Sequence, residues 1–139
     1  MSRAAPSAPA AVEQWLRAMN ADDVRARGEH LEAAIHPDAI VLRYGFDETR
    51  DDVIERLEGA EQIAAWLARS PAGTRFVLVG WDEAGSRLRY QVQVGGYLGA
   101  GTQAVTFDGQ GRITSVRHRP DDLDRAQVDA LARGVVAEA

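Results

Sequence analysis

Few side chains in this sequence have a type and a setting that could support chemistry, and His118 is the foremost of them. It closes the alternating run Arg112 to His118, which is typical of a strand. A neutral imidazole near pH 7 can accept or donate a proton, so His118 is the candidate catalytic residue. The alternative is a histidine at a strand end that is only hydrogen-bonded or partly solvated.

Arg43 is the second candidate, because it interrupts the apolar run Ala39 to Phe46. A guanidinium that faces a cavity can bind a carboxylate or another anionic group through two hydrogen bonds. The alternative is an edge-strand arginine paired with Glu55 or Glu58 across a hairpin. Both interpretations remain open at the level of sequence.

Trp15 and Tyr90 each combine a large apolar surface with one polar atom, which suits a ring-bearing ligand. The alternative for both is a place in the core or in an interface, as for the other aromatic residues. Gln103 could orient a ligand carbonyl or pair with the backbone. We therefore expect Trp15, Arg43, Tyr90 and Gln103 to be the ligand-binding residues.

Metal and cofactor chemistry are not expected. The chain has no cysteine, and His30 and His36 are six positions apart, which does not place them on one helix face. The glycines between Gly95 and Gly101 lie between two strands rather than between a strand and a helix. They therefore predict a flexible loop, not a nucleotide-binding turn.

The composition indicates one domain in a soluble, cytoplasmic protein. The chain has 139 residues and a formal net charge of −5, which disfavours a nucleic-acid partner. No apolar run is long enough to span a membrane. Residues 1–11 are rich in Ala, Pro and Ser without the apolar centre of a signal peptide, so we expect a disordered arm before a domain at 12–135.

Hydrophobic periodicity places the helices early and most strands late. Apolar residues recur at helical spacing in three early segments and at spacing two in the later ones. Asp108-Gly109 predicts a tight hairpin before the last strand. The expected helices are 10–19, 24–35, 59–67 and a short C-terminal one at 123–132, and the expected strands are 40–46, 53–57, 75–81, 87–94, 103–107 and 112–118.

This order resembles the nuclear-transport-factor-2-like superfamily, in particular its SnoaL-like and ketosteroid-isomerase-like branches. The matching stretches are Trp15 to Asp23, His36-Pro37-Asp38-Ala39, Gly59 to Trp66 and Phe107 to Ile113. The resemblance implies an α+β cone-shaped roll, in which a curved antiparallel sheet wraps around three N-terminal helices. It also implies a pocket at the open end and a homodimer formed through the outer face of the sheet, but no single activity.

Matched to a ketosteroid isomerase, the chain lacks the residues of that mechanism. Trp15 falls at the position of the oxyanion-hole tyrosine, Arg43 at that of the carboxylate base, and Gln103 at that of the protonated aspartic acid. An arginine cannot accept a proton at neutral pH, although Trp15 and Gln103 can still donate hydrogen bonds. The same matching places His118 on the inner face of the final strand.

The sequence therefore predicts a small-molecule-binding protein with a semi-apolar pocket for an apolar or ring-bearing ligand. If it is an enzyme, we expect a cofactor-free isomerase, cyclase or dehydratase acting on a carbonyl compound. His118 would transfer the proton, and Trp15, Gln103 and Arg43 would stabilise negative charge. The alternative is a non-catalytic ligand-binding or dimerisation module with the same fold.

Overall fold

The computed structural model describes residues 8–44, 53–70 and 73–120. The expected C-terminal helix and the polar loop at 47–52 lie outside these residues. The described chain runs through three helices and six strands, in the order α1 (Ala10–Asn20), α2 (Val24–Ala34), β1 (Ile35–Tyr44), β2 (Val53–Glu58), α3 (Gly59–Ala68), β3 (Arg75–Asp82), β4 (Arg87–Val94), β5 (Tyr97–Phe107) and β6 (Ile113–Pro120).

All six strands form one curved sheet in the order β2-β1-β6-β5-β4-β3. The expected α+β roll around three helices is confirmed, but the sheet is mixed because β1 and β6 are parallel. The long excursion through α3 and β3 to β5 allows β6 to return beside β1 in the same direction, which a hairpin cannot do. This pairing brings the end of β6 to the centre of the sheet.

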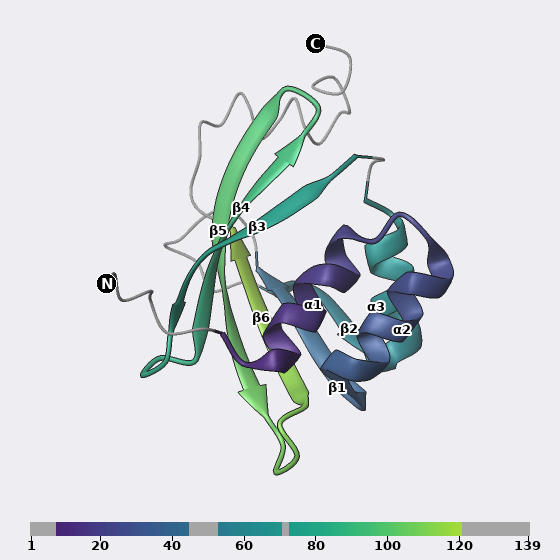
Figure 1. The fold of residues 1–139 in the computed structure, drawn as a ribbon, viewed down its shortest axis with the longest axis vertical. Helices are drawn as coiled ribbons and strands as arrows, with labels where there is room; N and C mark the ends of the chain where they lie inside the picture. Colours follow the sequence, from purple (N-terminus) through teal and green to yellow (C-terminus); the bar gives the residue numbers. More distant parts are fainter. Residues whose placement is uncertain (1–7, 45–52, 71–72, 121–139) are drawn as a thin grey trace, which may run out of the picture.

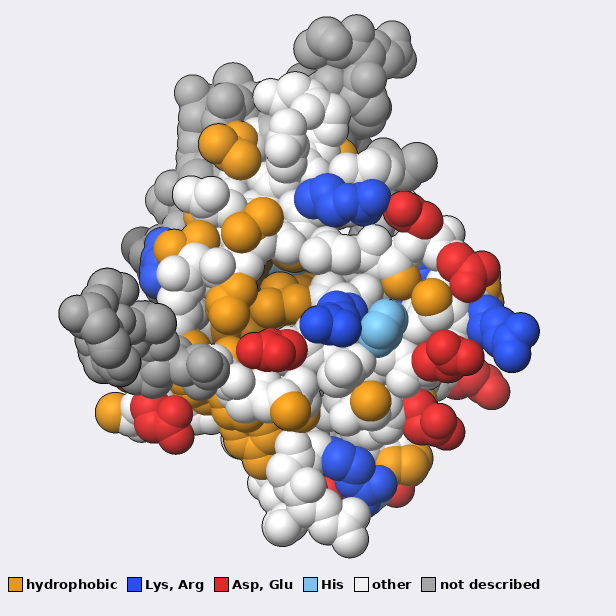
Figure 2. Space-filling view, viewed as in Figure 1, with side chains coloured by type: hydrophobic (Ala, Val, Ile, Leu, Met, Phe, Trp, Pro, Cys, Tyr) orange, Lys and Arg blue, Asp and Glu red, His pale blue; other side chains and the backbone are white. Residues whose placement is uncertain are grey.

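The helices gather on one side of the molecule, next to the β1–β2 end of the sheet, while β3, β4 and β5 curve away from them (Figure 1). In a space-filling view from the same side, hydrophobic side chains collect between the sheet and the helices, and charged side chains of both signs cover the helical part (Figure 2). The sheet therefore has an inner face toward the helices and an outer face on its other side.

Helix α1 supplies much of the core. Its predicted stripe of Val12, Trp15, Leu16 and Met19 is buried, and Trp15 and Val12 have no exposed surface. At its C-terminal end, the Asn20 side chain accepts a hydrogen bond from the backbone N–H of Phe76 and donates one to its carbonyl, at 2.6 and 2.8 Å. These two bonds connect the end of α1, the helix that carries Trp15, to β3.

The boundary between α2 and β1 differs from the expectation. The helix ends at Ala34, and His36-Pro37-Asp38 already lie in the strand. Pro37 is accommodated because the register between β1 and β6 is irregular between Ile35 and Ile40, where the ladder does not need its missing N–H.

The prediction of a glycine-rich loop from Gly95 to Gly101 is wrong for most of these residues. Strand β5 begins at Tyr97, and only Gly95 and Gly96 form the turn after β4. Gly95 has a φ of +57°, a conformation that suits glycine in a tight turn. The predicted Asp-Gly hairpin is confirmed, since the Asp108 carboxylate accepts hydrogen bonds from the backbone N–H groups of Gln110 and Arg112.

At the N-terminal side, α1 begins at Ala10, and Ala8 and Ala11 are each 7% exposed. The ordered fold thus includes residues at the end of the expected arm. No helix in the described ranges combines the length and the apolar character that crossing a membrane requires.

Candidate functional site

The pairing of three central strands assembles the candidate residues. His118 on β6 is paired with Gln103 on β5 and with Arg43 on β1. Residues that are paired across a ladder point to the same face, so these three side chains lie side by side. Tyr90 on β4 shares that face, because it is two positions from Leu88, the partner of Gln103. The sheet therefore brings four of the five predicted site residues together.

A chain of hydrogen bonds links these residues to α1. The Trp15 indole N–H donates to the Gln103 carbonyl oxygen, with Nε1 and Oε1 2.7 Å apart. The Gln103 Nε2 atom lies 3.3 Å from His118 Nδ1 and 3.7 Å from Met19 Sδ. On the other side of the ring, His118 Nε2 lies 2.6 Å from the Tyr90 hydroxyl. The fifth predicted residue, Trp15, thus joins the cluster through Gln103.

Aromatic rings enclose the His118 imidazole. Trp66 and Tyr90 approach it edge-on, with ring centroids 5.9 and 5.3 Å away, and Phe76 lies 5.3 Å from Tyr90. Trp15 and Gln103 have no exposed surface and Tyr90 has 3%, whereas Trp66, Phe76 and His118 are half-buried. The buried side chains of Trp15, Gln103 and Tyr90 form the inner part of the cluster. Trp66, Phe76 and His118 form its accessible edge.

This setting keeps the imidazole neutral. Desolvation, together with the positive charge of Arg43, lowers the pKa of His118 from 6.5 to about 3. At neutral pH the ring is therefore uncharged and a weak base. The strand-end histidine considered above is hydrogen-bonded, but it also lies at the centre of the cluster.

Arg43 is engaged by the protein itself. Its guanidinium forms an ion pair with Glu55, at 2.5 Å, and lies over the Trp66 ring, 5.5 Å from the centroid. Glu55 in turn pairs with Arg69 at 2.6 Å. Desolvation raises the pKa of Glu55, but hydrogen bonds from the two arginines hold this pKa below its ordinary value. The cross-hairpin pairing considered above is therefore the observed one.

Gly101 belongs to this cluster, although nothing in the sequence beyond its residue type indicates that. A Cβ atom at this position would lie 2.4 Å from the Tyr90 hydroxyl oxygen and 2.8 Å from the Arg119 carbonyl oxygen. Only glycine leaves room for the phenol beneath β5. The requirement comes from the pairing of Tyr90 with Gly101, which sequence spacing alone does not reveal.

The two other histidines are each hydrogen-bonded within the protein. His30 Nδ1 is 2.8 Å from the Gln14 side-chain oxygen, and His36 Nδ1 accepts a hydrogen bond from the Asp38 backbone N–H. Among the residues that the structure describes, no group of three or more metal-ligating side chains occurs.

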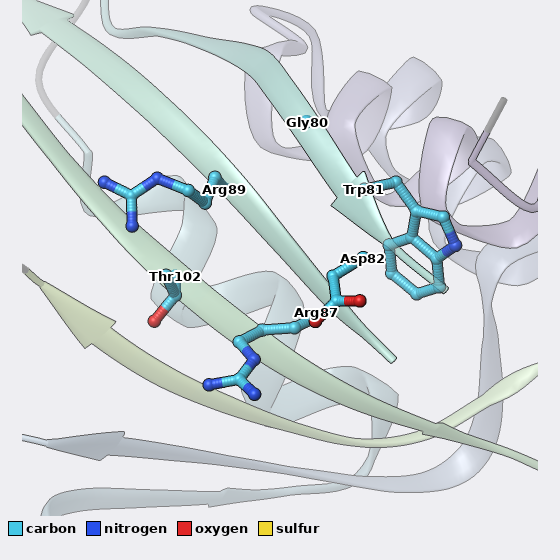
Figure 3. A pocket seen from close by; sticks show the side chains of 6 residues that line it. All are labelled: Gly80, Trp81, Asp82, Arg87, Arg89 and Thr102. Carbon is cyan, nitrogen blue, oxygen red and sulfur yellow. The ribbon is translucent and has the colours of Figure 1, made fainter. Parts of the chain in front are cut away.

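Three hollows lie away from the cluster. A pocket of about 380 Å³ opens on the outer face of the sheet, where Arg87, Arg89 and Thr102 point to the same side (Figure 3). A cavity of about 470 Å³ lies at the C-terminal end of α1, and one of about 510 Å³ lies between α2, α3 and the start of β1. Met19 lines the second of these hollows, and its sulfur lies 3.7 Å from Gln103 Nε2.

Comparison with known proteins was informative only at the level of structure. No family model matches the sequence, and no curated protein matches it. Among solved structures, a candidate isomerase of the SnoaL-like family from Agrobacterium tumefaciens has a TM-score of 0.60 and 24% identity, covering 80% of this chain and 94% of that chain. A candidate SnoaL-like polyketide cyclase from Jannaschia sp. CCS1 has a TM-score of 0.62 and 14% identity, covering 93% and 92%.

A third similar structure is a hypothetical protein from Catenulispora acidiphila with a ketosteroid-isomerase-like fold, in complex with trimethylamine. It has a TM-score of 0.59 and 18% identity, and the match covers 81% of this chain and 85% of that chain. At such identities the likeness establishes the fold. The activity must be argued from the cluster itself.

Proposed function

We propose that this chain, which has the cone fold of SnoaL-like and NTF2-like proteins, binds a small ring-bearing carbonyl compound at the inner face of its sheet. The observation that carries the proposal is the 2.6 Å contact between Tyr90 and His118, set among aromatic rings at a partly exposed edge. A hydroxyl and an imidazole in an apolar setting are suited to hold one polar atom of an otherwise apolar ligand.

The aromatic edge supplies the apolar part of such a site. Trp66 and Phe76 are half-buried, so each has ring surface available to a ligand ring. The Arg43 guanidinium covers Trp66 and is held in an ion pair with Glu55, which argues against an anionic ligand held by Arg43. An uncharged carbonyl compound therefore matches the site better than a carboxylate does.

The chemistry open to this site is polarisation of the carbonyl. A hydrogen bond to the carbonyl oxygen in a water-poor setting stabilises negative charge that develops on this oxygen. Isomerisation, cyclisation and dehydration of carbonyl compounds all use this stabilisation and need no cofactor. The names of the SnoaL-like isomerase and cyclase with a similar fold support this class of reaction.

A non-catalytic module is the second candidate, and two features favour it. Trp15 and Gln103 have no exposed surface, so the depth of the cone beneath the cluster is filled by side chains. On β3, Val77 and Val79 are 57% and 56% exposed, which offers an apolar strip to a second copy of the chain. In that case dimerisation through the sheet would be the function of the fold.

A ligand titration separates the two candidates. The probe is the ring ketone 1-tetralone, with tetralin, the same ring system without the carbonyl, as the control. We expect 1-tetralone to shift the Trp66 indole N–H signal in NMR spectra and to bind about tenfold more tightly than tetralin, the difference made by one hydrogen bond.

The matched variants are Tyr90→Phe, which should abolish the preference for the ketone, and Tyr44→Phe, which should leave it unchanged. Tyr44 is a suitable control because it is also buried but contacts Arg119 on the next strand rather than His118. If neither probe binds and sedimentation shows a dimer that Val77→Asp dissociates, the second candidate replaces the first.

A further inference from the structure

In the chain of hydrogen bonds from Trp15 to Tyr90, the Trp15 indole is the group whose direction is fixed. It determines the direction of the other bonds. The Trp15 indole N–H can only donate, so the atom of Gln103 that faces it at 2.7 Å must be the carbonyl oxygen. The amide nitrogen then points the other way, toward Met19 Sδ and His118 Nδ1. Turning the amide over would place its NH₂ against the indole N–H and lose the bond from Trp15.

The orientation of the amide fixes the proton on the histidine ring. Because Gln103 donates to Nδ1, this nitrogen presents a lone pair, and the single proton of the neutral ring lies on Nε2. The Nε2–H group therefore donates to the Tyr90 oxygen, 2.6 Å away. A charged ring would add a second N–H at Nδ1, directly opposed to the N–H of Gln103 and on the same face as the Arg43 cation.

We propose that Trp15 and Gln103 are positioning residues that hold His118 as its Nε2–H tautomer, so that His118 acts as a hydrogen-bond donor to Tyr90 and not as a proton acceptor. This differs from the proton-transfer role that the sequence suggested for His118. The donors run in one direction, from Trp15 through Gln103 and His118 to Tyr90. Each bond in such a chain polarises the next.

The proposal also defines the ligand, and in this respect it rests on the proposed function. The Tyr90 oxygen accepts from His118, so a hydrogen bond from the Tyr90 hydroxyl to a ligand continues the chain in the same direction. A carbonyl or enolate oxygen accepts such a bond, whereas an ammonium group, which only donates, does not. The charged and titratable groups that face the ring are Arg43 from β1 and Tyr90 from β4, and Arg43 is itself paired with Glu55 from β2.

Nitrogen NMR of the histidine rings in the full, ligand-free chain tests the assignment directly. We expect the His118 ring to show a protonated Nε2 and an unprotonated Nδ1 from about pH 8 to about pH 5, the range in which an unperturbed histidine gains its charge. The spectrum of His118→Gln identifies the signals. A protonated Nδ1 in the wild-type chain within this range would overturn the proposal.

Gln103→Glu is the variant that reverses the hydrogen bond between residue 103 and His118. A carboxylate at this position accepts from both neighbours, so it keeps the bond from Trp15 but favours a proton on His118 Nδ1. We expect the His118 signals to change to those of the doubly protonated ring at neutral pH. Gln91→Glu is the matched control, because Gln91 is exposed on the neighbouring strand β4 and should leave the His118 signals unchanged.

A second variant is available if Gln103→Glu does not fold. Trp15→Phe removes the donor that fixes the amide while keeping an aromatic ring, and we expect the His118 signals to become a mixture of the two neutral tautomers. A purely structural role for Trp15 would change stability but leave the tautomer as it is, which would contradict the proposal. These spectra need no ligand, so a failed titration with 1-tetralone and a failed tautomer assignment are separate results.

Discussion

The two faces of strands β4 and β5 are built from alternating residues of the same short segments, yet they differ in almost every property. On the inner face, Leu88 and Tyr90 are 0% and 3% exposed, and the polar atoms of Tyr90 and Gln103 lie in a connected chain of hydrogen bonds. On the outer face, Arg87 and Arg89 are exposed and line an open pocket of about 380 Å³.

A hollow in the surface differs from a cluster of oriented polar groups. The outer pocket has volume, but the charged groups that line it are exposed to water. The inner cluster has its polar atoms fixed in direction by their neighbours and a histidine whose pKa is lowered to about 3. Fixed polarity and a shifted pKa are the properties that functional sites use. Three predictions test this difference between the faces.

The largest difference is expected from truncating one residue on each face of β4. Leu88→Ala removes a fully buried side chain and should lower the free energy of unfolding by about 2–5 kcal/mol through lost transfer energy and a cavity. Gln91→Ala, on the exposed face, should change it by less than about 0.5 kcal/mol. Denaturant unfolding of both variants measures the two values. Equal losses would show that the two faces are not distinguished as the structure indicates.

A smaller loss is expected from adding one methyl group at Gly101. Gly101→Ala forces the Tyr90 hydroxyl away from its place, because the new Cβ would lie 2.4 Å from it, and overpacking of this kind costs about 1–3 kcal/mol. The matched variant is Gly80→Ala on β3, where a Cβ meets no atom within 4 Å. Thermal unfolding gives the stabilities, and the His118 NMR signals report whether Tyr90 has moved. An unchanged His118 spectrum in Gly101→Ala would contradict the packing described here.

Acid is expected to destabilise the protein gradually, with a small loss of stability for each unit of pH. The pKa of His118 is about 3 in the folded protein and 6.5 without burial, so between these values the unfolded chain binds the additional proton. Stability from this group is therefore fully present above about pH 6.5 and is lost as the pH falls toward 3, by up to about 1.4 kcal/mol per pH unit. Denaturant unfolding as a function of pH gives the slope. His118→Gln should show a slope that is shallower by this amount, and identical slopes would exclude a His118 that stays neutral in the folded protein.

Much of the fold was predictable because it depends on local patterns. The helical stripe of α1, the alternation of β4 and the Asp108-Gly109 turn each follow from a few neighbouring residues. The boundaries that failed depend on distant partners. Pro37 lies within β1 because the ladder to β6 is irregular there, and the glycines of β5 lie in a strand because β4 pairs with them.

The amino-acid sequence supplies the residue types of the cluster, namely His118, Tyr90, Gln103 and Trp15, without cysteine and without a carboxylate at the matched position of Arg43. What these residues do depends on how the chain folds. The pairing of Arg43 with Glu55 rather than with a ligand, the room for Tyr90 above Gly101 and the direction of every hydrogen bond from Trp15 onward depend on contacts between segments far apart in the chain. Polarity of this kind belongs to the arrangement, because an amide or an imidazole has no preferred direction until a neighbour that can only donate supplies one.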